Sequence, residues 1–510
     1  MNPVRLRFAP SPTGPLHIGG LRTALYNYLY ARQKGGVFVL RSEDTDQKRY
    51  VVGAEEYIRK ALAWCGISPD EGPEQGGNYG PYRQSERREL YAEYVKVLLE
   101  KGAAYYAFDT EDELDARREV EKAAGNHSFR YDASTRMSMR NSLSMDAAQV
   151  DQLLAAGTPH VVRFRIDPGE TITFADVVRE EVSFQSAELG DQVLMKTDGL
   201  PTYHMANIVD DHTMEITHVI RGEEWLSSTA LHVLLYRAFG WQPPVYAHIP
   251  LLLNPNGKGK LSKRKGADLG FPVFPLEWHD AAKNEVFAGF LEEGYLPEAL
   301  VNFIAFLGWN PGDEREMFTL DELVEAFSIE RINNSGARFD IDKAKWYNQQ
   351  YLIAMDDAEL APLVQKEFTA AGHSISTEQA TTIAGLLKER VQLLPEFYLQ
   401  GQYFVTAPAA YEEKPIRKKW KPEKLPLFAE MADDLAGLAD WSAPAIKETV
   451  VAFMGRHELG FGAVLPIIRV AVSGSVQGPD AFAILEAVGR EESVERLRMA
   501  YGAFDAIKAA

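Results

Sequence analysis

The chain is poor in cysteine and in long apolar runs. It has a single cysteine, Cys65, among 510 residues, and therefore cannot form an internal disulfide. It contains no run of roughly 18 apolar residues, the length that a membrane-spanning helix needs. Residues 1–10 lack the basic start and apolar stretch of a secretion signal. We therefore expect a protein of the cytoplasm, which is a reducing compartment, with no membrane partner.

Positive charge is also scarce. Lys and Arg number 54 against 73 Asp and Glu, so the formal net charge is −19 at pH 7. Binding to nucleic-acid phosphates requires clustered cations that displace counterions. The charge balance argues against a general nucleic-acid binder, and any RNA that binds this chain must contact local basic patches.

The first fifty residues carry the pattern of a strand, a helix and a second strand. Apolar residues alternate up to Phe8, an amphipathic helix then ends at Gly35-Gly36, and residues 37–40 form a short apolar run. This order predicts a right-handed parallel crossover, the half-unit of a nucleotide-binding sheet. Ligands of such sheets bind at the carboxyl ends of the strands.

A similar pattern returns at residues 218–221, 229–239 and 246–253, which predicts the second half of the same sheet. Beyond about residue 325 the periodicity is helical almost throughout. We therefore predict an α/β protein in which a Rossmann-like parallel-sheet domain with an α/β insertion precedes an all-α C-terminal region. The predicted parts are residues 1–102 and 186–255 for the two halves of the sheet domain, 103–185 for the insertion, 256–325 for a loop and helical region, and 326–510 for the helical region, which can comprise two subdomains.

A glycine-bearing turn at residues 9–20 connects the first strand to the helix. Gly19 and Gly20 permit close approach of a ligand, and the helix start offers free N–H groups and partial positive charge to phosphates. His17 can add a side-chain donor. A lone histidine in a turn is more often structural or solvated, so this motif needs support from elsewhere in the chain.

That support comes from a cationic loop at residues 260–266. It holds Lys260, Lys263, Arg264 and Lys265, and it follows the strand of the second crossover. Four cations on a glycine-bearing loop can neutralise the charge that develops on diphosphate as it leaves. The alternative is a solvated basic loop, which the pairing with the His17 turn at the same sheet edge disfavours.

The two motifs resemble the HIGH and KMSKS signatures of class I aminoacyl-tRNA synthetases, here residues 17–20 and 260–264. Gly20 stands in place of the second histidine of HIGH. Further blocks are similar, in order and spacing, to the bacterial glutamyl-tRNA synthetase family; they are residues 38–46, 82–87, 201–207, 219–225 and 337–340.

The resemblance implies an ATP-dependent ligase that joins L-glutamate to the 3′-terminal adenosine of tRNA(Glu), with Mg²⁺ accompanying ATP. It implies that His17, Lys260 and Lys263 are the catalytic residues. The implied ATP site comprises Pro10, Thr13, Gly14, His17, Gly19, Gly20, Glu224, Trp225, Lys260, Leu261, Ser262, Lys263 and Arg264. We expect a monomer.

The glutamate pocket should offer cations for two carboxylates and one anion for an ammonium group. Arg7 lies on the first predicted strand and Arg221 ends a later one, so both can pair with carboxylates in the crevice. Glu43 ends the second strand and can accept the ammonium group. Any one of these residues alone is more often a surface ion pair or a core side chain. By similarity to the family, the full set is Arg7, Ala9, Ser11, Glu43, Tyr203, Asn207 and Arg221.

The chain departs from the family at two places. Some members bind zinc through a Cys-x-Cys pair, where this chain has Ala107 and Asp109, and one cysteine cannot supply a thiolate site, so no zinc is expected. Residues 269–278 are longer and more aromatic than the family's segment after the cationic loop. Packing of an extended loop is the default interpretation of this segment.

The resemblance assigns anticodon binding to the helical region and acceptor-stem binding to the insertion. Residues 411–424 are cationic and contain Trp420, which predicts stacking on an unpaired base or, equally, a solvated loop. Arg390 falls by similarity where the third anticodon base is read. A glutaminyl enzyme, a tRNA-modifying glutamyl transferase without an anticodon-binding half and a non-catalytic RNA-binding descendant are the alternatives.

Overall fold

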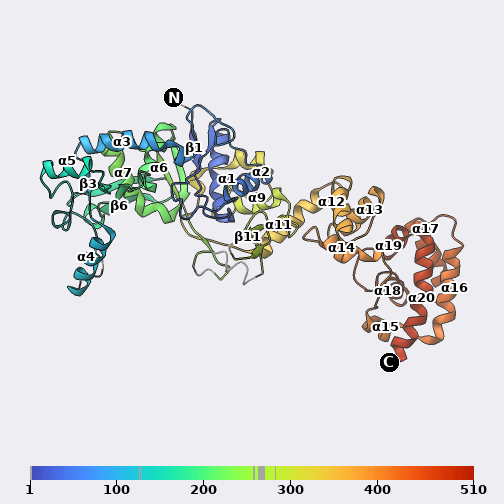
Figure 1. Cartoon of the computed structure of the whole chain (residues 1–510). Helices are drawn as coiled ribbons and strands as arrows, with labels where there is room; N and C mark the ends of the chain where they lie inside the picture. The colour runs from blue at the N-terminus through green and yellow to red at the C-terminus, as the bar shows by residue number, and fades with distance from the viewer. Residues whose placement is uncertain are drawn as a thin grey trace. The chain divides into compact units, whose positions relative to one another are not determined.

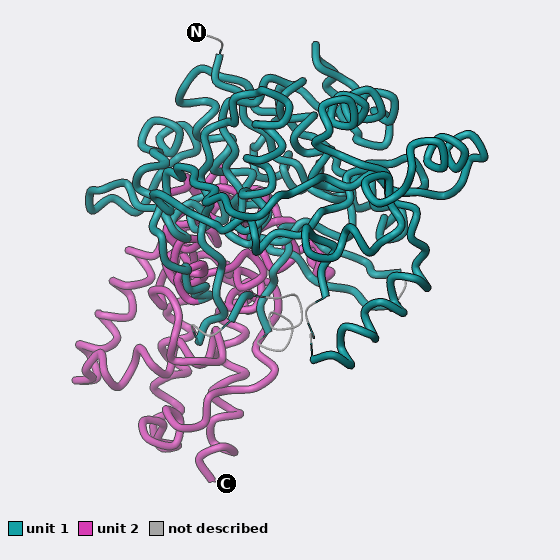
Figure 2. Tube along the Cα trace, turned by 90° about the vertical axis from the view of Figure 1, so that its left-hand side faces the viewer, with its two compact units in different colours: residues 1–290, 300–341 teal, residues 291–299, 342–510 magenta. Residues whose placement is uncertain are grey.

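The computed structural model describes residues 3–125, 127, 129–256, 259–261, 270–281 and 283–509. The chain divides into two compact units, which Figure 2 shows in different colours. Unit 1 comprises Met1–Phe290 and Leu300–Ile341, and unit 2 comprises Leu291–Ala299 and Asp342–Ala510.

Unit 1 begins with the parallel crossover that the sequence predicts. The strand β1 (Arg5–Phe8) leads through α1 (Ile18–Gln33) to β2 (Val37–Leu40), and the two strands pair in parallel. Leu21 and Leu25 are fully buried where α1 packs on the strands, because their spacing places them on one face of the helix. The predicted order of strand, helix and strand is therefore confirmed.

A second parallel crossover builds a four-stranded sheet. It consists of β8 (His218–Gly222), α7 (Leu226–Phe239) and β9 (Val245–Ile249). On its other side β9 pairs with β5 (Thr171–Asp176), which is antiparallel to β6 (Glu180–Gln185). The order is β6-β5-β9-β8, so this sheet takes two strands from the range predicted as an insertion.

The two crossovers do not share one continuous ladder, and the expectation of a single sheet is wrong in this respect. The backbone N–H of Thr217 donates to the carbonyl of Arg5 at 3.0 Å, and the N–H of Arg5 donates to the Thr217 hydroxyl at 2.9 Å. Because a side chain takes this donor of β1, the ladder is not continued toward β8.

Figure 1 labels many of the remaining elements of unit 1. Among them, β3, β4 and β7 form a separate antiparallel sheet in that order. Their bounds are α2 (Ala54–Trp64), α3 (Arg88–Glu100), β3 (Ala104–Ala107), α4 (Glu111–Ala123), α5 (Ala147–Ala155), β4 (Val161–Phe164), β7 (Val193–Met195), α6 (Tyr203–Thr213), β10 (Leu252–Leu253), β11 (Trp278–Asp280), β12 (Glu285–Phe287), α10 (Leu320–Ala326), β13 (Ala337–Arg338) and the short 3-10 turns η1 (Gln84–Arg87), η2 (Arg136–Ser138), η3 (Ser186–Glu188), η4 (Glu223–Trp225) and η5 (Ile329–Arg331), while α9 (Pro297–Ala305) spans the division between the units.

The aromatic segment after the cationic loop packs against unit 1, as the default interpretation expected for its described part, residues 270–278. Phe271 stacks on Phe339 with ring centroids 4.8 Å apart, and Trp278 meets the ring of Tyr57 edge-on at 5.4 Å. The carbonyl of Val273 accepts the N–H of Ile18 at 3.0 Å, so the segment also contacts the start of α1.

Unit 2 is built from helices around an apolar core. Trp420 lies inside this core, 1% exposed, and its ring stacks on Tyr501 while its indole N–H donates to Asp505 at 2.7 Å. The hypothesis that Trp420 stacks on an RNA base is therefore wrong. The bounds are α11 (Ile341–Ala354), α12 (Asp357–Ala370), α13 (Thr377–Leu387), α14 (Glu396–Gly401), η6 (Gln402–Phe404), α15 (Glu413–Lys419), η7 (Pro422–Lys424), α16 (Leu425–Ala436), α17 (Ala443–Arg456), α18 (Phe461–Ser473), α19 (Ala481–Val488) and α20 (Arg490–Ala509).

In the part of the chain that the structure describes, none of the helices combines the length and the apolar character needed to cross a membrane.

Candidate active site

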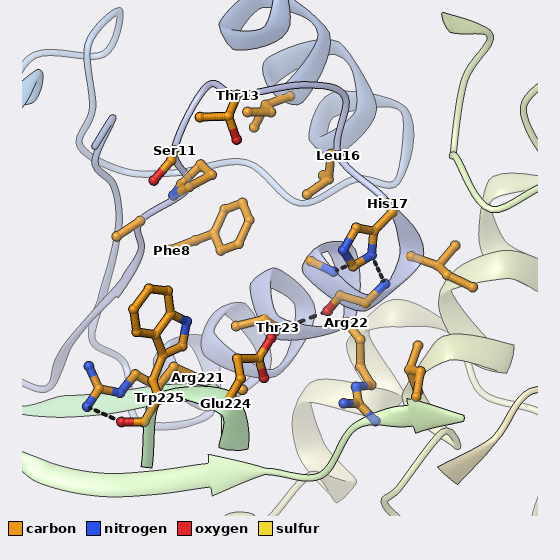
Figure 3. Close-up of a pocket in the computed structure, with 18 of the residues that line it drawn as sticks. Phe8, Ser11, Thr13, Leu16, His17, Arg22, Thr23, Arg221, Glu224 and Trp225 are labelled. Atoms are coloured by element: carbon orange, nitrogen blue, oxygen red, sulfur yellow. Dashed lines mark hydrogen bonds between the residues drawn. The ribbon is translucent and has the colours of Figure 1, made fainter. Parts of the chain in front are cut away.

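A pocket of about 590 Å³ lies in unit 1 where β1 and β8 end (Figure 3). Its walls are the turn before α1, the start of α1, the turn η4 after β8, and the segment around β10. The carboxyl ends of the parallel strands therefore hold the pocket, as the sequence predicts.

Most residues of the predicted site line this one pocket. They are Arg7, Ala9, Pro10, Ser11, Thr13, Gly14, His17, Gly19, Gly20, Glu43, Tyr203, Asn207, Arg221, Glu224, Trp225, Lys260 and Leu261. Ser262, Lys263 and Arg264 lie outside the described residues. Arg390 belongs to unit 2, where it is exposed in the turn after α13.

His17 is the N-cap residue of α1. Its Nδ1 accepts the N–H groups of Gly19 at 2.9 Å and Gly20 at 3.4 Å, as Figure 3 shows. The N–H of Leu21 donates to the carbonyl of His17, and that of Ile18 donates to a carbonyl of the aromatic segment. The expectation of free N–H groups at this helix start is therefore wrong, because the protein itself satisfies them.

The two glycines make this cap possible. A Cβ at position 19 would lie 2.7 Å from the imidazole of His17, and a Cβ at position 20 would lie 2.6 Å from the side chain of Leu16. Because Nδ1 of the neutral ring accepts hydrogen bonds, its proton is on Nε2. His17 can therefore donate from Nε2. The absence of side chains at positions 19 and 20 lets the imidazole lie close to the first turn of the helix.

Lys260 is held at the pocket by an acidic partner. Its ammonium group contacts a carboxylate oxygen of Glu224 at 2.9 Å, and both side chains are partly exposed. Burial opposes the ionisation of Glu224, but the neighbouring Lys260 lowers its pKa below the usual value. The pair places a cation at the mouth of the pocket that an incoming anion can recruit.

A buried ionic network joins the pocket residues Arg7, Glu43 and Asn207 to Arg41 and Asp211. Asp211 accepts Arg7 Nε at 3.0 Å and Arg41 Nη1 at 2.7 Å, and Arg41 also donates to Glu43 at 3.1 Å. Asn207 donates to the same Glu43 oxygen at 3.3 Å. Burial raises the pKa of Glu43 despite Arg41, so an additional cation beside Glu43 would stabilise its ionised form.

Arg221 differs from Arg7 and Arg41 because its partners are neutral. It is 5% exposed and donates to the hydroxyl of Tyr203 at 2.9 Å, the hydroxyl of Thr229 at 2.8 Å and Nε2 of His248 at 3.0 Å. Within the described residues, no carboxylate forms an ion pair with it. A buried guanidinium group that faces a pocket without a counterion is suited to bind a carboxylate ligand.

Tyr203 covers this arginine from α6. Its ring lies against Trp225, with centroids 4.3 Å apart, and burial raises the pKa of its hydroxyl. The hydroxyl is therefore neutral and can donate a proton while it accepts from Arg221.

Comparison with known proteins agrees with this architecture. Residues 3–346 match the family model for the catalytic domain of class I tRNA synthetases (E and Q), and residues 359–501 match an anticodon-binding domain. The glutamate–tRNA ligase of Christiangramia forsetii is 50% identical over 497 residues, and that of Phocaeicola vulgatus is 51% identical over 500 residues; each alignment covers 98% of both chains.

The chain belongs to the glutamate–tRNA ligase family.

Solved structures agree with this membership. The crystal structure of a glutamate–tRNA ligase from Elizabethkingia meningosepticum, in complex with its amino acid, has a TM-score of 0.96 and 47% identity, and the match covers 99% of this chain and 100% of that one. The enzyme from Elizabethkingia anophelis has a TM-score of 0.93 and 46% identity.

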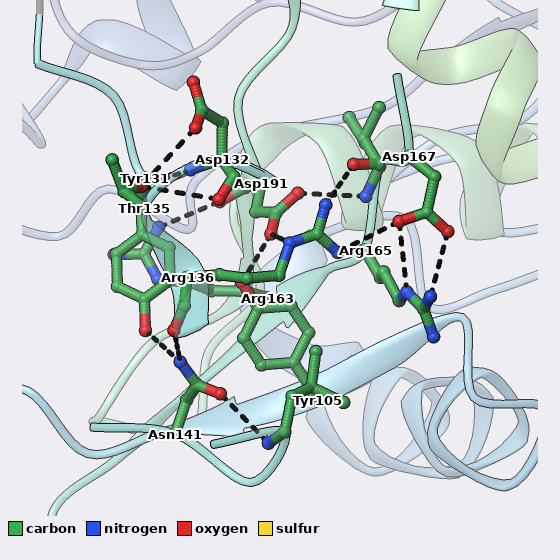
Figure 4. Close-up of polar contacts among 12 residues, drawn as sticks. Tyr105, Tyr131, Asp132, Thr135, Arg136, Asn141, Arg163, Arg165, Asp167 and Asp191 are labelled. Carbon is green, nitrogen blue, oxygen red and sulfur yellow. Dashed lines mark hydrogen bonds and ion pairs between the residues drawn. The ribbon is translucent and has the colours of Figure 1, made fainter. Parts of the chain in front are cut away.

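A polar network includes Asp109, which with Ala107 stands in place of the Cys-x-Cys pair named in the sequence analysis. Ala107 ends β3 and has no ligand atom, and the two oxygens of Asp109 accept the hydroxyl of Tyr131 at 2.9 Å and the N–H of Arg140 at 2.8 Å. These residues do not fit a zinc site. Figure 4 shows the adjoining contacts, in which Tyr131, Arg136, Asn141, Tyr105 and Asp191 are joined by hydrogen bonds and an ion pair.

Sequence reasoning missed Asp211, which binds the pocket residue Arg7, and several residues that line the pocket. Asp211 had a local signal, since it follows Tyr203 and Asn207 at intervals of four on α6 and therefore shares their helix face. Arg22 follows Ile18 at the same interval on α1 and donates to the carbonyl of Leu307 at 2.6 Å. The apolar pocket residues Leu252 and Val273 carried no chemical signal.

Proposed function

We propose that this pocket activates L-glutamate with ATP and transfers it to tRNA(Glu). An oxygen of the glutamate α-carboxylate attacks the α-phosphorus of ATP, and diphosphate leaves. A hydroxyl of the 3′-terminal ribose then attacks the carbonyl carbon of glutamyl-adenylate, and AMP leaves. No protein nucleophile is needed, so catalysis comes from positioning and from stabilisation of charge.

The observation that carries this proposal is the buried Arg221 with neutral partners. A buried charge without a counterion costs several kcal/mol, roughly 3 to 5 when one partner of a pair is missing. The side-chain carboxylate of glutamate supplies that counterion, whereas the neutral amide of glutamine does not. The relative from Elizabethkingia meningosepticum, which was solved with its amino acid, supports an amino-acid site in this fold.

The ammonium group of glutamate is assigned to an acidic residue, Glu43. Glu43 is buried, and an ammonium group beside it adds a second cation to that of Arg41 and favours its ionised form. Arg7 is held through Nε by Asp211, and its remaining N–H groups are assigned to the α-carboxylate side of the ligand. Ala9 and Ser11 line the same end of the pocket and complete the proposed glutamate site.

The phosphates of ATP lie at the other end in this proposal. His17 donates from Nε2, Lys260 leaves Glu224 for the phosphates, and Lys263 stabilises the charge that builds on the leaving diphosphate. Mg²⁺ enters as a component of the substrate, bound to ATP, because phosphate oxygens are its preferred ligands. Of the remaining predicted ATP contacts, Ser262 and Arg264 lie outside the described residues, and the others line the walls of the pocket; these are Pro10, Thr13, Gly14, Gly19, Gly20, Glu224, Trp225 and Leu261.

The tRNA contacts are assigned to regions of the chain. We assign the acceptor stem to residues 103–185 and 256–325, and the anticodon to residues 326–510, with the sheet domain in residues 1–102 and 186–255. The anticodon-binding family match at residues 359–501 supports the last assignment. Arg390 is exposed in this region and is assigned to the third anticodon base. The protein acts in this proposal as a zinc-free monomer in the cytoplasm.

Charging of total tRNA tests the proposal. With ATP, labelled glutamate should become esterified to tRNA, and nuclease digestion should release the label on the terminal adenosine, while glutamine should not be used. Label on an internal base would favour a tRNA-modifying glutamyl transferase. Tight tRNA binding without any esterification would favour a non-catalytic RNA-binding descendant, and esterification of glutamine would favour a glutaminyl enzyme.

A further inference from the structure

His248 lies directly beside Arg221 in the sheet. The parallel pairing of β8 with β9 places Arg221 opposite His248, so both side chains project from the same face. On the other side of β9, Asp176 pairs in register with Tyr246, two residues before His248, and reaches the same face. The register therefore brings together three polar side chains from three strands.

The imidazole of His248 connects the other two side chains. Its Nδ1 lies 2.6 Å from Asp176 Oδ2, and its Nε2 lies 3.0 Å from Arg221 Nε. A carboxylate can only accept and a guanidinium group can only donate, so Nδ1 carries the proton and Nε2 carries the lone pair. Burial lowers the pKa of His248, which agrees with this neutral form.

Asp176 is itself fixed. Its Oδ1 accepts the backbone N–H groups of Val178 at 3.0 Å and Arg179 at 2.9 Å, and the backbone N–H of His248 donates to its carboxylate at 3.1 Å. The side chains of Asp176 and His248 are both 0% exposed. The carboxylate therefore cannot turn away from the imidazole without leaving several donors unpaired.

The contacts determine the plane of the guanidinium group. Nε of Arg221 meets His248, and Nη2 meets Thr229 at 2.8 Å, so one edge of the group is held by the sheet and α7. Nη1 meets Tyr203 on the pocket side. An arginine that is anchored at one edge presents the other edge in one orientation, which lowers the cost of ordering it when a carboxylate binds.

We infer that Asp176 and His248 are positioning residues for substrate selection, because they orient Arg221 toward the side-chain carboxylate of glutamate. The inference rests on the proposed role of Arg221. Asp176 selects the tautomer of His248, and His248 supplies the acceptor that fixes Nε of Arg221. Neither residue contacts the substrate.

Two substitutions at position 248 separate orientation from packing. His248→Asn keeps a donor near the position of Nδ1 for Asp176 but has no acceptor at the position of Nε2. His248→Gln can place its carbonyl oxygen near Nε2 and accept from Arg221. We expect His248→Asn to raise the KM for glutamate about tenfold or more and to reduce the preference for glutamate over glutamine, and His248→Gln to raise that KM about threefold or less. In both variants the KM for ATP should stay within about twofold.

Equal increases in the KM for glutamate in the two variants, or a parallel increase in the KM for ATP, would overturn the inference and leave His248 a packing role. Thermal unfolding of both variants identifies a general loss of stability. Arg221→Ala, assayed in parallel, distinguishes a failure of the proposed role of Arg221 from a failure of the inference about His248. If Arg221→Ala leaves glutamate use intact, the proposed function of Arg221 fails; if it abolishes glutamate use while His248→Asn does not alter it, only the present inference fails.

A spectroscopic test reads the tautomer of His248 in the wild-type chain. In the full chain with ¹⁵N-labelled histidine, the resonances of His248 should report a protonated Nδ1 and an unprotonated Nε2. Their loss in His248→Gln assigns them. Asp176→Asn should shift the proton toward Nε2, because its amide can donate to Nδ1. A wild-type His248 protonated on Nε2 would contradict the proposed orientation of Arg221.

Discussion

The two units differ in the kinds of side chain that they bury. In unit 1 the buried side chains include charged groups from several strands and helices, such as Arg7, Arg41, Asp211 and Arg221. In the described part of unit 2, Arg496 is the one charged side chain that is buried, and the core is otherwise almost entirely apolar. Apolar contacts alone can hold a helical unit together, whereas buried charges require partners at defined distances.

This difference suggests that unit 1 binds ligands in its interior and that unit 2 binds them on its surface. Unit 1 pairs Arg7 and Arg41 with Asp211 and leaves Arg221 with neutral partners at the pocket. In the proposed function, the interior of unit 1 is therefore part of the substrate site. Unit 2 uses its interior for packing, so recognition by unit 2 must occur on its surface. Substitutions of buried polar residues should therefore alter both substrate use and stability in unit 1, but only stability in unit 2.

Arg221→Ala should give the largest effect. Removal of the guanidinium group leaves the substrate carboxylate without a partner in a closed pocket, so kcat/KM for glutamate should fall about 10³-fold, with little change in the KM for ATP. Discrimination against glutamine should fall as well. Steady-state aminoacylation measures these values, with Arg237→Ala, an exposed arginine of α7, as the control. Equal shifts for glutamate and glutamine would show that Arg221 does not read the side chain.

Asp211→Asn tests the ion pairs in unit 1. Burial opposes ionisation of Asp211, but Arg7 and Arg41 hold its pKa below the usual value. A folded-state pKa below the unfolded value means that Asp211 stabilises the fold above about pH 4 and loses this effect as pH falls through the folded-state pKa. The substitution should cost about 3 to 5 kcal/mol at pH 7 and less in acid.

Hydrogen exchange in unit 1 at pH 7 and at acid pH measures this loss. Asp434→Asn, which removes a partly exposed partner of Arg456 in unit 2, is the control and should change stability far less. A cost for Asp211→Asn that does not depend on pH would contradict the ionic role.

Lys263→Ala should lower the rate of glutamyl-adenylate formation by about 10² or more, because the lost charge acts mainly in the transition state. Single-turnover activation measures this rate, and glutamate binding should be affected less. Lys60→Ala on α2, where the lysine pairs with Glu56, is the control. Unchanged activation in a folded variant would remove Lys263 from its assigned role.

Trp420→Phe tests the apolar character of unit 2. The change removes the hydrogen bond to Asp505 and should destabilise unit 2 by about 1.5 to 3 kcal/mol while leaving tRNA affinity unchanged. Chemical unfolding and a tRNA-binding assay on the same sample measure both quantities. Weaker tRNA binding with unchanged stability would return Trp420 to a base-stacking role.

Arg390→Gln should give the smallest effect and tests recognition on the surface of unit 2. Cytosine offers two adjacent acceptors on its Watson–Crick edge that suit an arginine, whereas guanine offers donors there. The substitution should reduce discrimination between tRNA(Glu) and tRNA(Gln) by about 1 to 3 kcal/mol. Transcripts that differ only at the third anticodon base measure it, with the exposed Arg417→Gln as control. Equal preference before and after the change would place the reader elsewhere.

The sequence predicted features that depend on local spacing. The periods of strands and helices located both crossovers, and the glycine turn with His17 located the pocket, because each signal lies within a few consecutive residues. Family resemblance supplied the residues that the turn alone could not, including Arg221 and Glu43.

The contacts that sequence reasoning missed depend on register and on ring orientation. Asp176 and His248 are 72 positions apart, and only the pairing of β5 with β9 brings them together. The Nδ1 atom of His17 accepts hydrogen bonds from the first N–H groups of the helix, and residue spacing alone does not predict this ring orientation. The prediction that Trp420 stacks on a base was wrong because it rested on the cations beside Trp420 in sequence, whereas the neighbours of Trp420 in space include Tyr501.

A crystal structure of the full chain with bound glutamate would test most directly whether Arg221 supplies the counter-charge for substrate selection. The account predicts that the side-chain carboxylate contacts the guanidinium group of Arg221, that the ammonium group lies beside Glu43, and that the contact from Arg221 to His248 is retained. A glutamate whose side-chain carboxylate lies away from Arg221 in the occupied pocket would contradict it.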